Sequence, residues 1–423
     1  MKQNSKAAIR LGLIGMPLGH SWSPAIHSFF LHDDVYDLYE LQPSQLQEFT
    51  AERRLDGFNV TIPYKQQIMQ YLDACDPAAE AIGAVNTVVK RDGKLIGYNT
   101  DYLGLKQLLE GNGIAVNGRR VCVLGSGGAS KAAVRAVKEL GGTPSVVSRH
   151  PGSGEISYAE LKQQEAEFTV LINTTPVGMF PSVNYVPVDL AWFSRLEAVV
   201  DVVANPLRTS LCYEAKLKGI PSFGGFEMLV RQALEADRLF TGNPMEDASA
   251  HACMDALLKE RKGIALIGMP TSGKSTIAKL LGEALEKPVM EMDAELEKRL
   301  GTSIAQCFAD HGEAYFRDAE SALADELSGY EGIISCGGGL ILRKENMTAI
   351  SHNSLIFWID RNLDLLYGSD DRPLSRSRED LIRLYDERKD RYALYSDYRI
   401  ENNSTAEEAA AKILAIWNGR KEA

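Results

Sequence analysis

The sequence predicts an α/β fold with more than one domain. Apolar runs of strand length alternate with helical patterns along the chain, as they do where helices cover largely parallel sheets. At 423 residues the chain is too long for one ordinary domain, and we expect about two to four folding units. Two glycine-rich turns each follow an apolar run and precede a helical pattern, which indicates two places where a helix N-terminus meets phosphate.

The expected strands and helices follow one another in order. The strand-like runs are Arg10–Ile14, Gly57–Ile62, Val121–Leu124, Ser145–Ser148, Thr169–Asn173, Ala198–Val203, Ile264–Ile267, Gly332–Ser335 and Leu355–Ile359. Helical patterns include Ser130–Leu140, Tyr158–Glu167, Asp247–Glu260 and Thr276–Leu285. The helix that precedes Ile264 passes into that strand without a Pro- or Ser-rich spacer, which indicates a short connection between two halves.

Composition and charge exclude several classes of protein. A formal net charge of −11 argues against a general binder of nucleic acid or membrane surfaces. The six cysteines are scattered without a C-x-x-C pair, so neither a disulfide framework nor a zinc site is expected. The N-terminus lacks a signal-peptide pattern, and no apolar run approaches the length of a membrane span. We expect a cytoplasmic protein that acts on small molecules, and a homo-oligomer stays open.

The first glycine-rich turn lies in VCVLGSGGASKAA at 121–133. Gly125, Gly127 and Gly128 allow a tight turn and let the backbone approach a pyrophosphate at the start of a helix. The next strand ends in Arg149, where an NAD site usually has an acidic residue. A guanidinium binds phosphate in bidentate fashion, so this position favours the 2′-phosphate of NADP. The alternative is that Arg149 is an ordinary solvated residue.

Four polar runs suggest a site for a small polyhydroxylated acid. They are GMPLGHSWSP at 15–24, GFNVTIPYK at 57–65, GAVNT at 83–87 and GYNTD at 97–101. Together they supply hydroxyls, amides, one ammonium and one carboxylate, which are the groups that such a ligand needs. Each run also has a simpler explanation, because Ser23-Pro24 can cap a helix and Asn86 can set a turn.

These runs, with NTTPVGM at 173–179 and GGFEMLVRQA at 224–233, resemble shikimate dehydrogenase over about residues 9–258. The resemblance implies an N-terminal α/β substrate domain over residues 1–104 and 230–260. It also implies a Rossmann NADP-binding domain over residues 105–229.

The resemblance assigns roles to individual residues. Ser21 and Ser23 would hold the carboxylate of shikimate, and Lys65 with Asp101 would form the catalytic pair. The remaining substrate contacts would be Thr61, Asn86, Asp101 and Gln232, and the cofactor contacts would be Gly125, Gly127, Gly128, Ala129, Ser148, Arg149 and Gly225. Reduction of a ketone needs a proton donor at the nascent alkoxide, and an ammonium beside a carboxylate supplies one. One departure is Ala204, which occupies the family's usual tyrosine position.

The second glycine-rich turn lies in IALIGMPTSGKST at 264–276 and has the spacing G-x-x-x-x-G-K-S. Gly268 and Gly273 let backbone N–H groups surround a phosphate, and Lys274 can reach the outer phosphates of a nucleotide. The Ser275 hydroxyl can hold Mg²⁺, and Thr276 follows it at the start of the helix.

Downstream motifs resemble shikimate kinase over about residues 262–418, which implies a P-loop nucleoside-monophosphate-kinase-like α/β domain over residues 261–423. The motifs are VMEMDAELEKRLGTSI at 289–304, HGEAYFRDAE at 311–320, SCGGGLI at 335–341, DDRPLS at 370–375 and ERKDRYALY at 387–395. The resemblance implies that Asp293 meets the reacting hydroxyl. It assigns the following further contacts: Arg317 and Arg388 to the carboxylate, Gly338 and Gly339 to the ring, Arg372 to the ATP phosphates, and Ser275 with Glu291 to Mg²⁺. Departures are Glu291, which replaces an aspartate, and a short acidic lid.

The sequence therefore predicts a bifunctional enzyme that reduces 3-dehydroshikimate with NADPH and then phosphorylates shikimate with ATP and Mg²⁺. Two alternatives stay open. One half could bind shikimate as a sensor or scaffold without turnover. Ala204 and Glu291 leave this alternative open, because they depart from the family patterns. The dehydrogenase half could also act on quinate.

Overall fold

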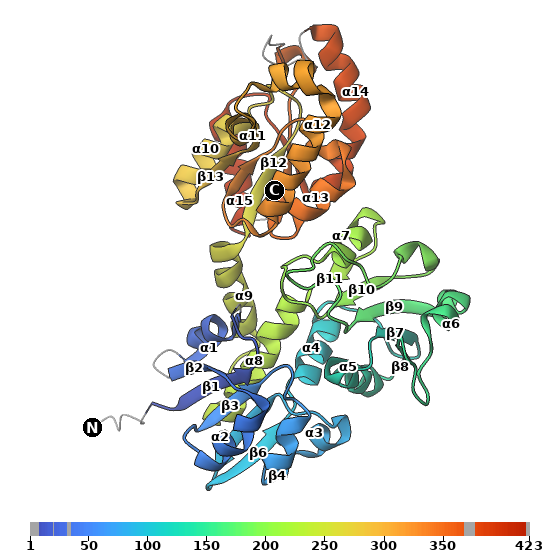
Figure 1. Cartoon of the computed structure of the whole chain (residues 1–423), viewed down its shortest axis with the longest axis vertical. Coiled ribbons are helices and arrows are strands. Elements are labelled where there is room, and N and C mark those ends of the chain that lie inside the picture. The colour runs from blue at the N-terminus through green and yellow to red at the C-terminus, as the bar shows by residue number, and fades with distance from the viewer. Residues whose placement is uncertain (1–7, 20, 32–34, 368–376, 420–423) are drawn as a thin grey trace. The chain divides into compact units, whose positions relative to one another are not determined.

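The computed structural model describes residues 8–19, 21–31, 35–367 and 377–419. The chain divides into two compact units. The first comprises Met1–Asn205 and Glu214–Leu257, and the second comprises Pro206–Tyr213 and Leu258–Ala423. Within the described ranges, no helix is both long and apolar enough to cross a membrane. Each unit is described below by itself, and most of its helices and strands are labelled in Figure 1.

The first sheet has the strand order β2-β1-β3-β5-β6-β4. Its strands are β1 (Arg10–Gly15), β2 (Val35–Glu40), β3 (Gly57–Val60), β4 (Ala74–Cys75), β5 (Thr87–Arg91) and β6 (Lys94–Tyr98). Strand β1 lies between β2 and β3 and is parallel to both, whereas β5 is antiparallel to β3 and to β6. The turn between β5 and β6 contains Asp92 and Gly93, whose φ angles of 50° and 74° are typical of a two-residue hairpin turn.

The second sheet is parallel throughout and has the order β11-β10-β9-β7-β8. Its strands are β7 (Arg120–Leu124), β8 (Thr143–Val147), β9 (Phe168–Asn173), β10 (Ala198–Asp201) and β11 (Ser222–Phe223). Successive strands lie first on one side of β7 and then on the other. The carboxyl ends of β7 and β9 therefore form a topological switch point, which is where open α/β sheets bind ligands.

The third sheet lies in the second unit, is also parallel, and has the order β13-β14-β12-β15-β16. Its strands are β12 (Gly263–Ile267), β13 (Val289–Glu291), β14 (Ile333–Ser335), β15 (Ser354–Asp360) and β16 (Tyr398–Glu401). All five residues of β12 are buried, as expected for a central parallel strand covered on both faces.

Helices alternate with these strands. Those before β12 are α1 (Ser23–Leu31), α2 (Leu46–Glu52), α3 (Pro77–Ile82), α4 (Asp101–Gly111), α5 (Gly128–Glu139), α6 (Tyr158–Gln163), α7 (Ser210–Leu217), α8 (Gly225–Thr241) and α9 (Ala248–Arg261). Those after it are α10 (Lys274–Leu285), α11 (Met292–Leu300), α12 (Ile304–Glu326), α13 (Lys344–Ser351), α14 (Arg378–Tyr395) and α15 (Ala406–Trp417). Helix α12 is interrupted at Gly312, whose φ of 82° is not helical. The predicted α/β class is confirmed.

Each sheet has its own apolar core. Residues of α4 and α5 pack on the second sheet, where Leu105, Val123 and Ala136 are completely buried. Residues of α10 and α15 pack on the third, where Ile277 and Ile413 are completely buried. These cores hold the strand ends and helix starts that carry the candidate site residues.

Candidate active sites

The first candidate site is built around an ion pair between Lys65 and Asp101. The Lys65 Nζ lies 2.6 Å from Oδ2 of Asp101, and the side chains are 22% and 10% exposed. Asp101 is the first residue of α4, where the helix dipole favours a negative charge. The pair is thus partly buried and still open to solvent on the lysine side, as a proton donor to a bound ligand needs to be.

Asn86 connects this pair to two further elements. Its Nδ2 donates to Oδ1 of Asp101 at 2.9 Å, to Oγ1 of Thr100 at 2.9 Å and to Oε1 of Gln232 at 3.1 Å. Its Oδ1 accepts from the backbone N–H of Thr100 at 2.7 Å. The structure therefore brings together four residues predicted from the sequence, namely Lys65, Asn86, Asp101 and Gln232.

Glycines allow the close approaches that assemble this site. A Cβ on Gly104 of α4 would lie 2.9 Å from both Cβ and the backbone nitrogen of Gln232, so only glycine lets α8 pack this closely on α4. A Cβ on Gly15 would lie 2.3 Å from Cγ2 of Thr61. Thr61 is thereby held against the loop that follows β1, and its backbone N–H donates to Ile14 O at 2.9 Å.

The predicted carboxylate ligands Ser21 and Ser23 lie in that loop and at the start of α1. The backbone N–H of Ser23 donates to Oγ of Ser21 at 3.2 Å, and both residues are partly exposed. The loop is anchored to β2, because the Leu18 N–H donates to Oε1 of Glu40 at 2.6 Å.

The predicted dinucleotide turn lies at the switch point of the second sheet. Gly125 has a φ of 102°, and its N–H donates to Val147 O at 2.8 Å. Gly127 is the N-cap of α5, and a Cβ there would meet no atom within 4 Å. The N-terminus of α5 therefore borders open space at Gly127, which fits a pyrophosphate there. Gly128 and Ala129 follow in the first turn of α5 and are partly exposed.

The remaining predicted cofactor residues lie at the ends of neighbouring strands. Ser148 follows β8, is buried, and accepts at Oγ from the His150 N–H at 3.3 Å. Arg149 is exposed beside it, which fits a role in binding a solvent-facing phosphate. Gly225 begins α8 against the end of β10, since a Cβ there would lie 2.2 Å from Val202 O. Ala204, the departure from the family pattern, is partly exposed after β10.

The second candidate site starts at the loop between β12 and α10. Gly268 has a φ of 147° and Gly273 a φ of 95°, and added Cβ atoms would lie 2.4 Å from Ile359 O and 2.5 Å from Nδ2 of Asn402. These glycines are therefore required by the fold of the loop as well as by a phosphate. The Nζ of Lys274 is 3.0 Å from Gly268 O, so the ammonium is held inside the loop.

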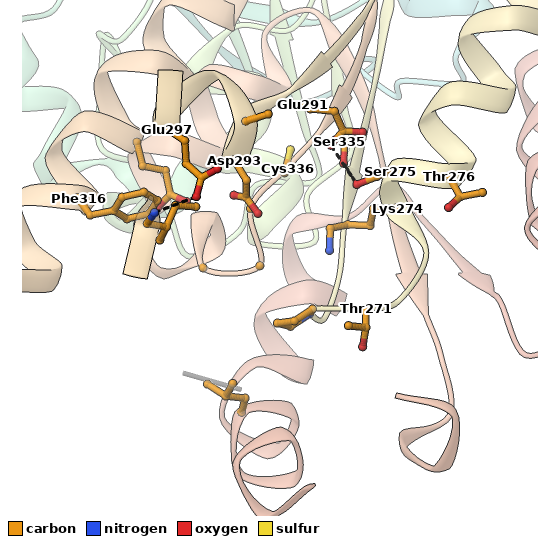
Figure 2. A pocket seen from close by; sticks show the side chains of 18 of the residues that line it. Thr271, Lys274, Ser275, Thr276, Glu291, Asp293, Glu297, Phe316, Ser335 and Cys336 are labelled. Carbon is orange, nitrogen blue, oxygen red and sulfur yellow. Dashed lines mark hydrogen bonds between the residues drawn. The ribbon is translucent and has the colours of Figure 1, made fainter. Parts of the chain in front are cut away.

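A cavity of about 1160 Å³ opens beside this loop. Figure 2 shows Lys274 and Asp293 facing the cavity, with Ser275 and Glu291 joined by a hydrogen bond at one end. Their Oγ and Oε2 atoms are 3.0 Å apart. Thr276 and the predicted substrate residues also line the cavity: Asp293, Arg317, Gly338, Gly339 and Arg388.

Ser275 and Glu291 fit a magnesium site of the kind that the sequence predicts. Among the described residues, no group of three or more His, Cys, Asp and Glu forms a metal cage. Mg²⁺ bound with nucleotide usually takes only one or two protein ligands and keeps several waters. A hydroxyl beside a carboxylate is therefore a sufficient set, and Ser335 adds a second hydroxyl 3.5 Å from Oγ of Ser275.

The glycine triplet packs directly against the charged groups of the cavity. A Cβ on Gly337 would lie 2.6 Å from Oδ1 of Asp293, and one on Gly339 would lie 2.3 Å from Nη2 of Arg317. Arg317 donates from Nη1 to Oε2 of Glu320 at 2.8 Å and from Nη2 to Oε1 of Glu313 at 2.9 Å. Burial lowers the pKa of Arg317, but the two carboxylates outweigh it and raise the pKa overall.

Arg388 comes from α14 and is 4% exposed. Its Nη1 donates to Gly338 O at 2.9 Å, and the Tyr392 hydroxyl donates to the same oxygen at 2.7 Å. Burial raises the pKa of Tyr392 to about 12, so the phenol keeps its proton. Within the described residues the Nε of Arg388 has no hydrogen-bond partner, and a ligand carboxylate would satisfy it. The predicted lid residue Arg372 lies outside the described residues.

Several residues of these sites were not assigned from the sequence. Glu313 and Glu320 flank Arg317 at spacings of four and three, a helical ion-pair signal that is common on any surface helix. Thr87 bonds Asn86 and Thr100, and its only sequence signal is its place in a polar run. Ser335 precedes the glycine triplet at the end of β14, where a parallel strand meets the site.

Comparison with known proteins matches each half of the chain to a family. The family model "Shikimate dehydrogenase substrate binding domain" matches residues 13–88, and the model "Shikimate kinase" matches residues 270–417. The shikimate dehydrogenase (NADP(+)) of Caldicellulosiruptor bescii is 38% identical over 258 residues, which is 55% of this chain and 88% of that protein.

Solved structures agree over the first half. Shikimate dehydrogenase 1 from Peptoclostridium difficile has a TM-score of 0.55 and 33% identity, covering 59% of this chain and 97% of that one. The shikimate 5-dehydrogenase of Thermus thermophilus, solved with NADP(H) and shikimate, has a TM-score of 0.54 and 32% identity, covering 58% and 98%. The two resemblances drawn from the motifs are confirmed.

Proposed function

Because the chain belongs to the shikimate dehydrogenase family and carries a shikimate kinase domain after it, we propose that it catalyses two successive reactions. The first is the NADPH-dependent reduction of 3-dehydroshikimate to shikimate. The second is the ATP-dependent phosphorylation of shikimate at its 3-hydroxyl. We further propose that residues 1–104 and 230–260 bind the first substrate, residues 105–229 bind NADP, and residues 261–423 carry the kinase reaction.

The observation that carries this proposal is the Lys65–Asp101 pair, held in place by Asn86. NADPH, when bound at the switch point of the second sheet, supplies the reducing equivalent. The Lys65 ammonium then gives a proton to the carbonyl oxygen as negative charge develops there. Asp101 orients the ammonium through Oδ2, while Asn86 fixes its other oxygen. Ser21 and Ser23, which are partly exposed, bind the carboxylate of the acid.

In the second half, ATP with Mg²⁺ supplies the phosphoryl group. Asp293 accepts a hydrogen bond from the attacking hydroxyl and orients it. Arg317 and Arg388 pair with the carboxylate of the acid, because a guanidinium offers a fork of donors that matches two oxygens. Lys274 moves from the loop carbonyls to the outer phosphates and stabilises the charge of the transition state.

The proposal is tested by one coupled assay. Purified protein is incubated with 3-dehydroshikimate, NADPH, ATP and Mg²⁺, and shikimate 3-phosphate is followed by chromatography. Formation of this product that depends on both NADPH and ATP supports the proposal. Accumulation of shikimate without phosphorylation, or tight calorimetric binding without turnover, would show that one half binds its ligand without catalysis. The rates of NADP⁺-dependent oxidation of quinate and of shikimate, measured side by side, show which of the two acids is the substrate.

Arg149 is expected to discriminate NADPH from NADH. Since the guanidinium is exposed at the end of β8, Arg149→Ala should raise the KM for NADPH about 10- to 100-fold, because one charge-assisted contact to the 2′-phosphate is lost. The KM for NADH should stay close to that of the wild type. Steady-state kinetics with both cofactors check this result. Equal changes in the KM for NADPH and the KM for NADH would show that Arg149 does not contact the 2′-phosphate.

Arg317 is expected to bind the acid rather than the nucleotide. Arg317→Lys keeps a positive charge beside the buried Glu320 but removes the planar fork of donors. We expect the KM for shikimate in the kinase reaction to rise about tenfold or more, with little change in the KM for ATP. Initial rates at varied concentrations of each substrate test this. A selective loss of ATP affinity would reverse the assignment of the two ends of the cavity.

A further inference from the structure

A buried tyrosine lies behind the first candidate site. Tyr36 of β2 donates from its hydroxyl to Oδ1 of Asn59 at 2.8 Å. The Ser23 side chain interacts with the phenol and lowers its pKa, but burial and the charge of Asp237 raise the pKa overall. The hydroxyl therefore keeps its proton, and it joins the start of α1 to the end of β3.

Tyr36 is held in place by a buried pair. The Nδ1 of His27 lies 2.6 Å from Oδ1 of Asp237, with side chains 1% and 0% exposed. The imidazole stacks on the Tyr36 ring, with centroids 4.1 Å apart and an angle of 15° between the planes. The phenol therefore has little freedom to rotate away from its partners.

Each helix that contributes to this pair also carries a predicted substrate residue. Ser23 and His27 are four residues apart on α1, which places them on one face of that helix. Gln232 and Asp237 lie on α8, and Gln232 contacts Asn86 in the site. The pair thus connects the helix that carries the serine with the helix that carries the glutamine.

A second route leads from Tyr36 into the site through Asn59. The Nδ2 of Asn59 donates to Oγ1 of Thr87 at 3.1 Å, and Thr87 donates to Oδ1 of Asn86 at 3.2 Å. Asn86 in turn holds Asp101. Hydrogen bonds therefore run from Tyr36 to the catalytic pair. On its other side, the phenol interacts with the side chain of Ser23, the predicted carboxylate ligand.

We propose that Tyr36, fixed by the His27–Asp237 pair, is a positioning residue that sets Ser23 relative to Asn86 and so determines the affinity for the acid. This inference rests on the proposed dehydrogenase activity. Stability alone does not account for the arrangement, since burying polar side chains costs free energy that their hydrogen bonds have to offset. A rigid polar frame behind a binding site instead keeps its ligands at a fixed spacing.

The test is Tyr36→Phe, which keeps the ring stacked on His27 and removes only the hydroxyl. We expect the KM for shikimate in the NADP⁺-dependent oxidation to rise about tenfold, with kcat and the KM for NADP⁺ changed less than about twofold. Tyr39→Phe on the same strand is the matched control, because its ring packs on Phe49 outside this network. It should leave all three constants unchanged.

A second variant tests the part played by the pair. Asp237→Asn should raise the KM for shikimate in the same direction, and the effects of Asp237→Asn and Tyr36→Phe should combine to less than their product, since both act through one frame. An unchanged KM in Tyr36→Phe, or an equal rise in the KM for NADP⁺, overturns the inference. A wild-type protein without turnover refutes the proposed function instead, and calorimetric titration of shikimate into wild type and Tyr36→Phe then tests the frame alone.

Discussion

Lys65→Ala is expected to reduce the rate of 3-dehydroshikimate reduction by about 10²- to 10⁴-fold, which is the usual contribution of a positioned general acid. The Nζ of Lys65 lies 2.6 Å from Oδ2 of Asp101, so this ammonium is positioned to donate the proton. Without it, the alkoxide would have to take its proton from water. The measurement is the NADPH oxidation rate at saturating concentrations of both substrates.

The control for this variant is Lys90→Ala. Lys90 also forms a partly exposed ion pair in the first unit, with Asp56 at 3.1 Å, but it lies at the far end of β5 from the site. The Lys90→Ala variant should therefore reduce 3-dehydroshikimate at the wild-type rate. Lys65→Ala should still phosphorylate added shikimate normally. Loss of both activities in a Lys65→Ala protein with a native circular dichroism spectrum would contradict the separation of the two reactions.

The motifs that follow buried strands were predictable because parallel strands place their carboxyl ends at one edge of a sheet. Gly125 after β7 and Gly268 after β12 both have the positive φ that their motifs require. The hairpin of β5 and β6 was missed, although Asp92-Gly93 between two strands that carry apolar residues is a recognised hairpin signal. The edge strand β2 was missed because most of its residues are exposed and give no apolar run.

The contacts among His27, Asp237 and Tyr36 behind the first site could not be predicted from the sequence. His27 and Asp237 are 210 residues apart, and no local sequence pattern around either residue predicts that the two are in contact. Their contact depends on the return of α8 to the first sheet, and the family resemblance supplied that return only in outline. The same reasoning applies to Gln232, whose role came from a motif, whereas its contact with Asn86 needed the fold.

Lys274→Ala is expected to reduce phosphorylation of shikimate by about 10²- to 10³-fold, because it removes a positive charge that stabilises the phosphoryl transition state. Lys274 is 9% exposed, and its ammonium is fixed by Gly268 O and Met269 O. Its matched control is Lys298→Ala on α11, a lysine whose side chain is 81% exposed. That variant should retain the wild-type rate in an ADP-release assay.

The two lysine variants together decide whether the reactions are independent. No predicted residue of either reaction comes from the motifs of the other, and shikimate is a small product that can leave the protein. A mixture of Lys65→Ala and Lys274→Ala should therefore convert 3-dehydroshikimate into shikimate 3-phosphate, the first by its kinase half and the second by its dehydrogenase half. The intermediate must diffuse between molecules. When 3-dehydroshikimate is labelled, added unlabelled shikimate should therefore compete with the labelled intermediate and lengthen the lag before label appears in shikimate 3-phosphate. If the mixture makes shikimate but no shikimate 3-phosphate, and a natively folded Lys65→Ala also fails to phosphorylate added shikimate, the kinase half accepts only shikimate formed on the same chain.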